Sequence, residues 1–168
     1  MGISPKIHES VFLCEGARII GDVVIEKDSS IWYNTVIRGD VNYIRIGERT
    51  NIQDNSILHV TYKKYPLMIG SDVTAGHGVV VHGCTVKDSV LIGMGAILLD
   101  NCTVNSNSLI AAGTVVREGF EVPEGVLVAG VPGRIIRELS LEEIDKIKQS
   151  ARNYVMYVGN YRGANVKE

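Results

Sequence analysis

A six-residue repeat of aliphatic residues runs through most of the 168-residue chain. Successive steps of six lead from Ile7 to Ile37. Two longer steps and one step of five, which ends at Val86, interrupt the regular spacing before the last such residue, Val116. We call the segment that begins at each of these aliphatic residues a rung, and the chain has 18 of them. The fifth residue of nearly every rung is small or β-branched. Each rung therefore offers one large and one small residue to a core, which is typical of a solenoid.

Two inward positions per six residues fit a short flat strand followed by a tight corner. Three such rungs close one triangular coil, so the 18 rungs predict an all-β solenoid of about six coils. Successive coils would stack at a strand spacing of about 4.8 Å. A β-sandwich is disfavoured because its strands do not hold a six-residue phase for so long. The 18 glycines, against only 2 Phe and 1 Trp, agree with a chain rich in turns.

The phase breaks at residues 60–68 and 41–45, which we predict to be excursions from corners of the coil. Insertions of this kind often gather on the functional face of a repeat protein. Glycine and proline are dense in residues 122–139, so we predict a coil over residues 1–121 followed by a turn-rich connection.

A helix is predicted at the end of the chain. The pattern Ser140-Leu-Glu-Glu143 is a capping box, so residues 140–168 are predicted to form a C-terminal helix and tail. Apolar residues on one stripe indicate that this helix packs along the coil or onto a neighbouring chain. We expect one structural domain overall.

The charge balance excludes some classes of partner. The chain carries 17 basic and 19 acidic residues, for a net charge of −2. A dedicated nucleic-acid or anionic-membrane binder needs a basic field, so we expect neither. No apolar run is long enough to span a membrane, and the first residues hold no signal-peptide core, so we expect a cytoplasmic protein. Three widely spaced cysteines without a CxxC motif argue against a disulfide framework or a cysteine zinc site.

Three histidines, His59, His77 and His82, cluster around the longer insertion. If the insertion adds no rung, His59 and His82 lie on the same side of the prism, one coil apart. Their rings would then point outward about 4.8 Å apart, close enough to share a metal ion. His77 belongs to the adjacent side and should point away from this pair. A threefold rotation would bring another chain's His77 to it, so the spacing predicts a homotrimer with metal sites between subunits.

The ligand type indicates the chemistry. Three neutral imidazoles with an open fourth position are typical of a catalytic zinc site. Such a metal lowers the pKa of a bound water, and the resulting hydroxide can attack CO2 or a carbonyl group. Candidates to orient this hydroxide and its neighbours are Gln53, Asn51 and Asp54.

Arg38 is predicted on the same side of the prism as His59, one coil below it. We expect Arg38 and Asp40 to form an ion pair between chains that helps to build the trimer.

Several of these residues belong to sequence motifs that also occur in a known protein family. Together, across essentially the whole chain, these motifs resemble the γ-class carbonic anhydrase family: Ile37-Arg-Gly-Asp40, Asn51-Ile-Gln-Asp54-Asn-Ser-Ile-Leu-His59 and Ala75-Gly-His77-Gly-Val-Val-Val-His82. The resemblance implies a left-handed parallel β-helix with a C-terminal helix, assembled as a homotrimer. It also implies zinc, with iron or cobalt in some settings, between the subunits.

The family pattern implies roles for individual residues. His59 and His82 would come from one chain and His77 from the next. Gln53 would hydrogen-bond the metal-bound hydroxide, and Asn51 would help to orient CO2. Tyr154 would match a helix tyrosine near the metal, and Arg38 with Asp40 would match the interface ion pair.

The chain departs from the family pattern in its proton-transfer groups. The best-characterised members carry a glutamate directly after the Arg-Gly-Asp motif and a longer acidic loop whose glutamate shuttles protons. Here Val41 and a short basic loop, Thr-Tyr-Lys-Lys-Tyr, stand in those places. Regenerating hydroxide requires proton export, so hydration without a shuttle would be slow or undetectable.

Three hypotheses follow. The leading one is a lyase that reversibly hydrates CO2 to bicarbonate by a zinc-bound hydroxide. The second is an acyltransferase using acyl-coenzyme A, since the repeat and the turn Ala129-Gly-Val-Pro-Gly-Arg134 resemble hexapeptide transferases. The third is a non-catalytic metal-binding or scaffold trimer, because the proton shuttle is missing.

Overall fold

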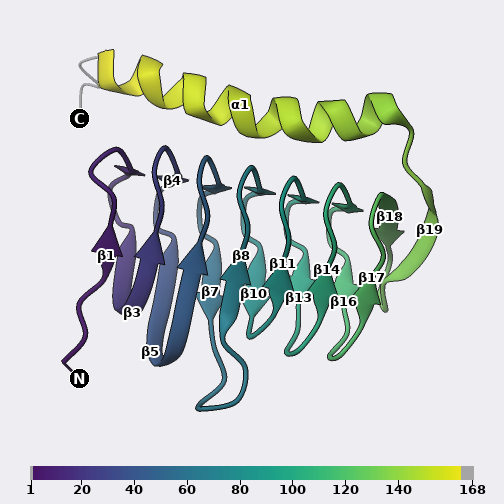
Figure 1. The fold of residues 1–168 in the computed structure, drawn as a ribbon, viewed down its shortest axis with the longest axis horizontal. Helices are drawn as coiled ribbons and strands as arrows, with labels where there is room; N and C mark the ends of the chain where they lie inside the picture. The colour runs from purple at the N-terminus through teal and green to yellow at the C-terminus, as the bar shows by residue number, and fades with distance from the viewer. Residues whose placement is uncertain (1, 164–168) are drawn as a thin grey trace.

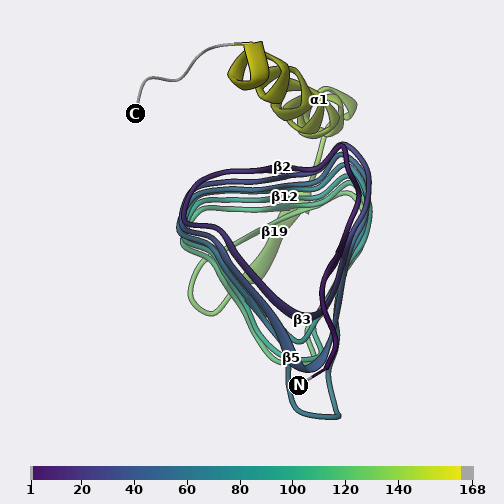
Figure 2. The same ribbon diagram turned by 90° about the vertical axis from the view of Figure 1, so that its left-hand side faces the viewer.

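A computed structural model describes residues 2–163 of the chain. The chain forms a parallel β-solenoid of about seven turns, with one long helix lying along it (Figure 1). Seen along its axis, the coil is triangular, and the helix lies outside it next to one side (Figure 2). The predicted all-β solenoid with a C-terminal helix alongside is therefore confirmed.

The strands form three sides, which we name the covered, the open and the third side. The covered side, next to the helix, consists of β2 (Phe12–Leu13), β4 (Ser30–Ile31), β6 (Asn51–Ile52), β9 (Thr74–Ala75), β12 (Leu91–Ile92), β15 (Leu109–Ile110), β18 (Val126–Ala129) and the antiparallel β19 (Arg134–Glu138). The open side consists of the first halves of β3 (Arg18–Ile25) and β5 (Val36–Ile46), then β7 (Ile57–His59), β10 (Val80–His82), β13 (Ile97–Leu98) and β16 (Val115–Val116). The third side consists of β1 (Lys6–Ile7), the second halves of β3 and β5, then β8 (Leu67–Ile69), β11 (Thr85–Val86), β14 (Thr103–Val104) and β17 (Glu121–Val122).

The six-residue phase decides which side chains enter the core. The large aliphatic residue of each rung points inward, and Ile52, Leu58 and Val81 have no exposed surface. Several of the small residues are hydroxyls that bond to the neighbouring coil. Thr35 Oγ1, for example, donates to the carbonyl oxygen of Gln53 at 2.9 Å. Burial of most of these hydroxyls is tolerated because they find an acceptor in the next coil; the buried Thr114 Oγ1 has no partner among the described residues.

The coil is longer than predicted, because it continues beyond residue 121. β17 pairs with β14, and β18 pairs with β15. Val122 and Val128, in these strands, are fully buried. The glycines and prolines of residues 122–139 predict the end of the repeat, but a coil of this kind needs a turn at every corner. Part of the predicted connection is thus the last turn of the solenoid.

Both predicted insertions lie at the corner between the open and third sides. Residues 41–45 remain within β5, where the register between β3 and β5 shifts between Gly21 and Val23. The larger insertion is shorter than predicted, because Leu67–Ile69 already form β8. We call residues 60–66 the corner loop. It projects from the coil at the foot of Figure 1, between β7 and β8.

Helix α1 (Leu141–Gly163) packs on its own coil, over β4 and β9. The capping box forms as predicted, since Ser140 Oγ accepts from Glu143 N at 3.2 Å and Glu143 Oε2 accepts from Ser140 N at 2.9 Å. The buried stripe comprises Ile147, Ala151 and Val158. Within residues 2–163, no helix combines the length and the apolar character needed to cross a membrane. Residues 164–168 of the predicted tail lie outside the described part.

Aromatic side chains hold the end of α1 against the covered side. Trp32, after β4, packs edge to face against Tyr154 and Tyr161, with ring centroids 5.4 and 5.2 Å away. The ring centroid of Phe12 lies 5.9 Å from those of both Trp32 and Tyr161. Such edge-to-face pairs add to the stabilisation from burial.

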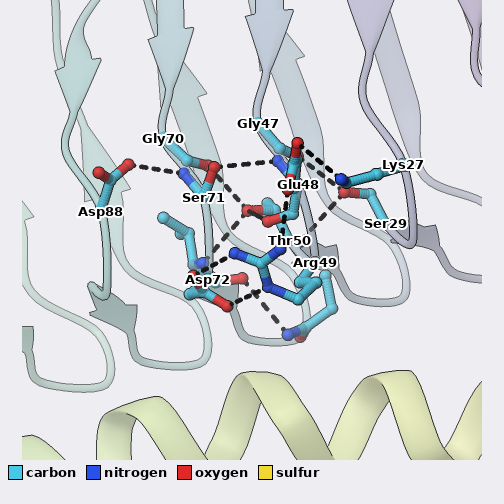
Figure 3. A network of polar contacts seen from close by, with 12 residues as sticks. Lys27, Ser29, Gly47, Glu48, Arg49, Thr50, Gly70, Ser71, Asp72 and Asp88 are labelled. Atoms are coloured by element: carbon cyan, nitrogen blue, oxygen red, sulfur yellow. Dashed lines mark hydrogen bonds and ion pairs between the residues drawn. The ribbon is translucent and has the colours of Figure 1, made fainter.

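A polar network braces successive coils at the corner between the third and covered sides (Figure 3). Arg49 makes two bonds to Asp72, at 2.7 and 2.8 Å, and a third to Glu48 at 2.8 Å. Lys27, one coil earlier, lies 3.4 Å from the Glu48 carboxylate. The bidentate geometry fixes the planar guanidinium between two coils, which stiffens this corner beneath α1.

Candidate metal centre

His59 and His82 lie side by side on the open side, as the rung count predicts. β7 and β10 are adjacent parallel strands, and the two histidines are register partners. His59 Nδ1 is 3.0 Å from His82 Nε2. One nitrogen of each ring therefore faces the other ring.

A carboxylate faces the outer nitrogen of each ring. Asp40 Oδ1 is 3.2 Å from His59 Nε2, and Asp100 Oδ1 bonds to His82 Nδ1. A carboxylate accepts a hydrogen bond, so each outer nitrogen carries a proton. The 3.0 Å between the inner nitrogens is a distance that an N–H···N hydrogen bond also has. With both protons on the outer nitrogens of neutral rings, the two inner nitrogens would both present lone pairs, which suits a shared cation.

The surroundings favour a neutral His59 and charged Asp40 and Asp100 carboxylates. Burial lowers the pKa of His59 and outweighs the hydrogen bond to Asp40. The Arg38 guanidinium lowers the pKa of Asp40. Burial opposes ionisation of Asp100, but hydrogen bonds from Thr61 and His82 outweigh it and lower the pKa of Asp100. The pair of rings is thus flanked by two carboxylates, whose negative charge favours a cation bound beside the rings.

Arg38 and Asp40 form an ion pair within the chain, with Arg38 Nη1 2.6 Å from Asp40 Oδ2. The sequence predicts this pair between chains, and that interchain role stays a prediction. Within one chain, Asp40 already links Arg38 to His59, one oxygen to each.

His77 stands apart from the pair, at the corner between the covered and open sides. It lies in the turn that precedes β10, whereas His82 ends that strand. His77 Nδ1 is 2.8 Å from Asp54 Oδ2, one coil below. Its side chain is 52% exposed, against 19% for His59. A cavity of about 340 Å³ beside it is lined by Asp54, Trp32, Tyr33, Tyr154, Tyr157 and Tyr161.

Asn51 and Gln53 lie beneath α1 and are almost completely buried. Gln53 Nε2 donates to Asn51 Oδ1 at 3.0 Å, and Asn51 Nδ2 donates to Thr74 Oγ1 at 2.9 Å. Thr74 in turn donates to Ser150 of the helix at 3.2 Å. This network fixes the orientation of both amides.

Tyr154 contributes to the same region from the helix. It packs on Trp32 and lines the cavity beside His77. Burial raises the pKa of its phenol, followed in importance by the negative charge of Asp54, so the hydroxyl stays protonated at neutral pH.

The predicted residues therefore form two separate groups. The pair group contains His59, His82, Arg38 and Asp40 on the open side. The corner group contains His77, Asp54, Gln53, Asn51 and Tyr154 around the helix-covered edge. Within residues 2–163 of a single chain, no set of three or more His, Cys, Asp or Glu side chains is arranged to hold a metal ion.

Sequence reasoning missed Asp100 and Thr61. Asp100 follows β13, one coil after His82, and Thr61 in the corner loop donates to Asp100 Oδ2 at 2.6 Å. The spacing of 18 residues between His82 and Asp100, three rungs or one coil, is the signal that could have found the pair.

The donor set fits zinc. Two nitrogens bound at about 2.0–2.1 Å to a tetrahedral zinc lie about 3.3 Å apart. The observed 3.0 Å between His59 Nδ1 and His82 Nε2 is close to that spacing. Each ring also has the hydrogen-bonded carboxylate that usually accompanies a zinc-binding histidine. The pair supplies two ligands and leaves the remaining positions open.

The bacterial transferase hexapeptide (six repeats) model matches residues 83–118. Those residues belong to the coil and contain none of the three clustered histidines. Carbonic anhydrase of Geobacillus kaustophilus is 46% identical over 92% of this chain and 84% of its own length. Gamma carbonic anhydrase 2 of Arabidopsis thaliana mitochondria is 45% identical over 98% of this chain.

The chain belongs to the γ-class carbonic anhydrase family. It spans 61% of the length of the Arabidopsis protein. Among solved structures, a hexapeptide transferase family protein from Anaplasma phagocytophilum matches this γ-class fold with a TM-score of 0.91 at 42% identity, covering 95% of this chain and 94% of that one. The γ-class resemblance inferred from the three motifs, two of which contain the clustered histidines, is therefore confirmed.

Proposed function

We propose that this protein is a homotrimeric zinc-dependent lyase that interconverts CO2 and bicarbonate at sites between its subunits. The observation that carries the proposal is the facing pair of nitrogens on His59 and His82, each ring backed by a carboxylate. The family supports the reaction, since relatives of similar sequence bear the name carbonic anhydrase.

The open side supports the trimer. Its outward residues include the apolar Ile20, Ile57 and Leu99, which are 41, 48 and 38% exposed, next to polar and charged side chains. Within residues 2–163, no helix lies over this side, in contrast to the covered side (Figure 2). A contiguous apolar surface next to polar side chains is typical of a protein interface. Association through it would place the corner group of one chain beside the pair group of the next.

In the proposed site, His59 and His82 of one chain and His77 of the next hold the zinc. Bound zinc supplies a nucleophile for CO2 at neutral pH by lowering the pKa of a water molecule. Gln53 and Asn51 of the corner group orient the reacting groups, since the bond from Gln53 to Asn51 and the bond from Asn51 to Thr74 fix their amides. Iron or cobalt would fit the same nitrogen ligands.

Tyr154 and Asp54 have supporting roles in this proposal. Asp54 holds the ring of His77 through Nδ1, which leaves Nε2 for the metal. Tyr154 closes the side of the cavity next to α1 and offers a protonated hydroxyl.

The proton route is the weak part of the site. Val41 offers no titratable group, and the corner loop presents Lys63 and Lys64 packed on Tyr62 and Tyr65 rather than acids. Buffer molecules would have to carry the proton, so we propose a slow enzyme whose rate rises with buffer concentration.

Metal analysis of protein purified without chelators, followed by CO2 hydration assays with zinc, cobalt and iron, tests the proposal. We expect about one metal per chain and hydration that is lost in His77→Ala. Full metal loading without turnover over a wide pH range would favour a scaffold instead. Saturable binding of acetyl-coenzyme A by calorimetry, with no metal, would favour an acyltransferase.

A further inference from the structure

Asp100 and Thr61 form a contact that no proposed step above uses. Asp100 lies at the corner between the open and third sides, one coil after His82. Its two carboxylate oxygens have different partners: Oδ1 bonds to His82 Nδ1, and Oδ2 accepts from Thr61 Oγ1 at 2.6 Å. Both ends of the carboxylate are thus occupied, so its plane is fixed.

The backbone is shaped to admit this carboxylate. Gly83 directly follows His82, and a Cβ on Gly83 would collide with Asp100 Oδ1. Its φ of +49° is also in the left-handed region that favours glycine. Asn101 N donates to the carbonyl oxygen of Gly83 at 2.8 Å, which holds the two coils in register at this point.

The corner loop is itself anchored at Thr61. Asn42 Nδ2 donates to the Thr61 carbonyl oxygen at 3.1 Å, and Thr61 N donates to Tyr65 O at 3.0 Å. These bonds tie the loop to β5 on one side and close it on the other. The position of the Thr61 hydroxyl is therefore determined by the fold of the loop.

The two contacts have a chemical consequence for the ligand. A carboxylate on Nδ1 keeps the imidazole proton there, which leaves Nε2 with a lone pair. Nε2 of His82 is the atom that faces His59. Without Asp100, the proton could move to Nε2 and the ring could turn away from the pair.

We propose that Asp100 is a positioning residue that holds His82 with Nε2 ready for the metal, and that Thr61 couples the corner loop to this ligand. The proposal rests on the proposed function, since it takes His82 as a metal ligand. In this chain the basic corner loop acts by supporting a ligand, where the family pattern would place a proton shuttle.

Zinc affinity of the intact protein, measured by competition with a chelator, tests this in Asp100→Asn and Thr61→Val. We expect Asp100→Asn to weaken zinc binding about 10–100-fold and Thr61→Val to weaken it less. Asp88→Asn is the matched control, because Asp88 is also a corner aspartate but accepts from the backbone of Ser71 and contacts no histidine. It should bind zinc like the wild type.

Nitrogen NMR of the histidine rings in metal-free protein gives a second readout that a general loss of stability would not move. We expect the His82 proton on Nδ1 in the wild type and a shift towards Nε2 in Asp100→Asn. Unchanged zinc affinity together with an unchanged ring in both variants would overturn the proposal. If the wild type bound no metal, the proposed function and the effect on metal affinity would both fail, and the ring measurement would still decide whether Asp100 sets the tautomer.

Discussion

The open and covered sides of the coil share one repeat but meet different surroundings. On the covered side, outward residues such as Trp32, Asn51 and Gln53 are buried under α1 and satisfied within the chain. On the open side, Ile57 is half exposed, and His59 and His82 face each other at the surface. The covered side is completed within one chain, whereas in our proposal the open side is completed by a partner. The same repeat would thus provide stability on one side and an assembly surface on the other.

The largest expected effect comes from placing a charge on the open side. Ile57→Glu would bury a carboxylate in the proposed interface, where it has no partner. We expect the protein to become a folded monomer that has lost its metal, as measured by light scattering with metal analysis.

Met68→Glu is the matched control, because Met68 is an exposed apolar residue of 38% exposure on the third side. It should leave the trimer and its metal intact. A trimer that survives Ile57→Glu, or one that dissociates equally in both variants, would mean that the open side is not the interface.

A smaller effect is expected from opening the covered side. Trp32→Ala removes the ring on which Tyr154 and Tyr161 pack, together with the bond from its indole nitrogen to Ser30. We expect a loss of about 3–5 kcal/mol in the free energy of unfolding, from denaturant titration. Tyr62→Ala, in the exposed corner loop, should change it by less than about 0.5 kcal/mol. If Trp32→Ala changed the free energy of unfolding as little as Tyr62→Ala does, the aromatic side chains around Trp32 would not be what holds the helix.

The smallest effect concerns the start of α1. Ser140→Ala removes the cap of Glu143 N and should cost about 1 kcal/mol, read from the same titration. An unchanged midpoint would contradict the importance of the cap for docking the helix.

The cap also predicts a pH dependence. Hydrogen bonds from Arg137, and then from the backbone of Ser140, lower the pKa of Glu143 from 4.5 to about 2. A carboxyl whose pKa is lower in the folded state stabilises the fold above the unfolded value and loses that effect as the pH falls. The difference in thermal midpoint between wild type and Glu143→Gln should therefore be full above about pH 5 and vanish as the pH approaches 2. A difference that is independent of pH would show that the charge of Glu143 does not matter.

Much of the coil could be predicted because its core follows one local rule. The six-residue phase correctly places Ile52, Leu58 and Val81 inside, and the same phase puts His59 beside His82. The number of a rung also assigns it to one side of the triangular coil. Counting rungs therefore predicts that His77 lies apart from His59 and His82. The capping box marked the helix start for an equally local reason.

The rest depended on contacts that the repeat does not encode. The position of α1 on the covered side is decided by Trp32 and its aromatic neighbours, which are spread over the chain. Asp100 and Thr61 meet only because the corner loop folds back over the next coil. The two final rungs, at Val122 and Val128, could not be predicted, because glycine and proline mark a corner of the coil and the end of the coil equally well.

The central claim is that one site is built from two chains, and a mixture of two inactive variants tests it most directly. His77→Ala lacks the corner ligand, and His82→Ala lacks one ligand of the pair. Each alone should bind almost no zinc. In trimers formed at random from equal amounts of both, about one quarter of the interfaces join an intact pair to an intact His77. The account predicts recovery of about that fraction of wild-type zinc, and a mixture that binds none would contradict it.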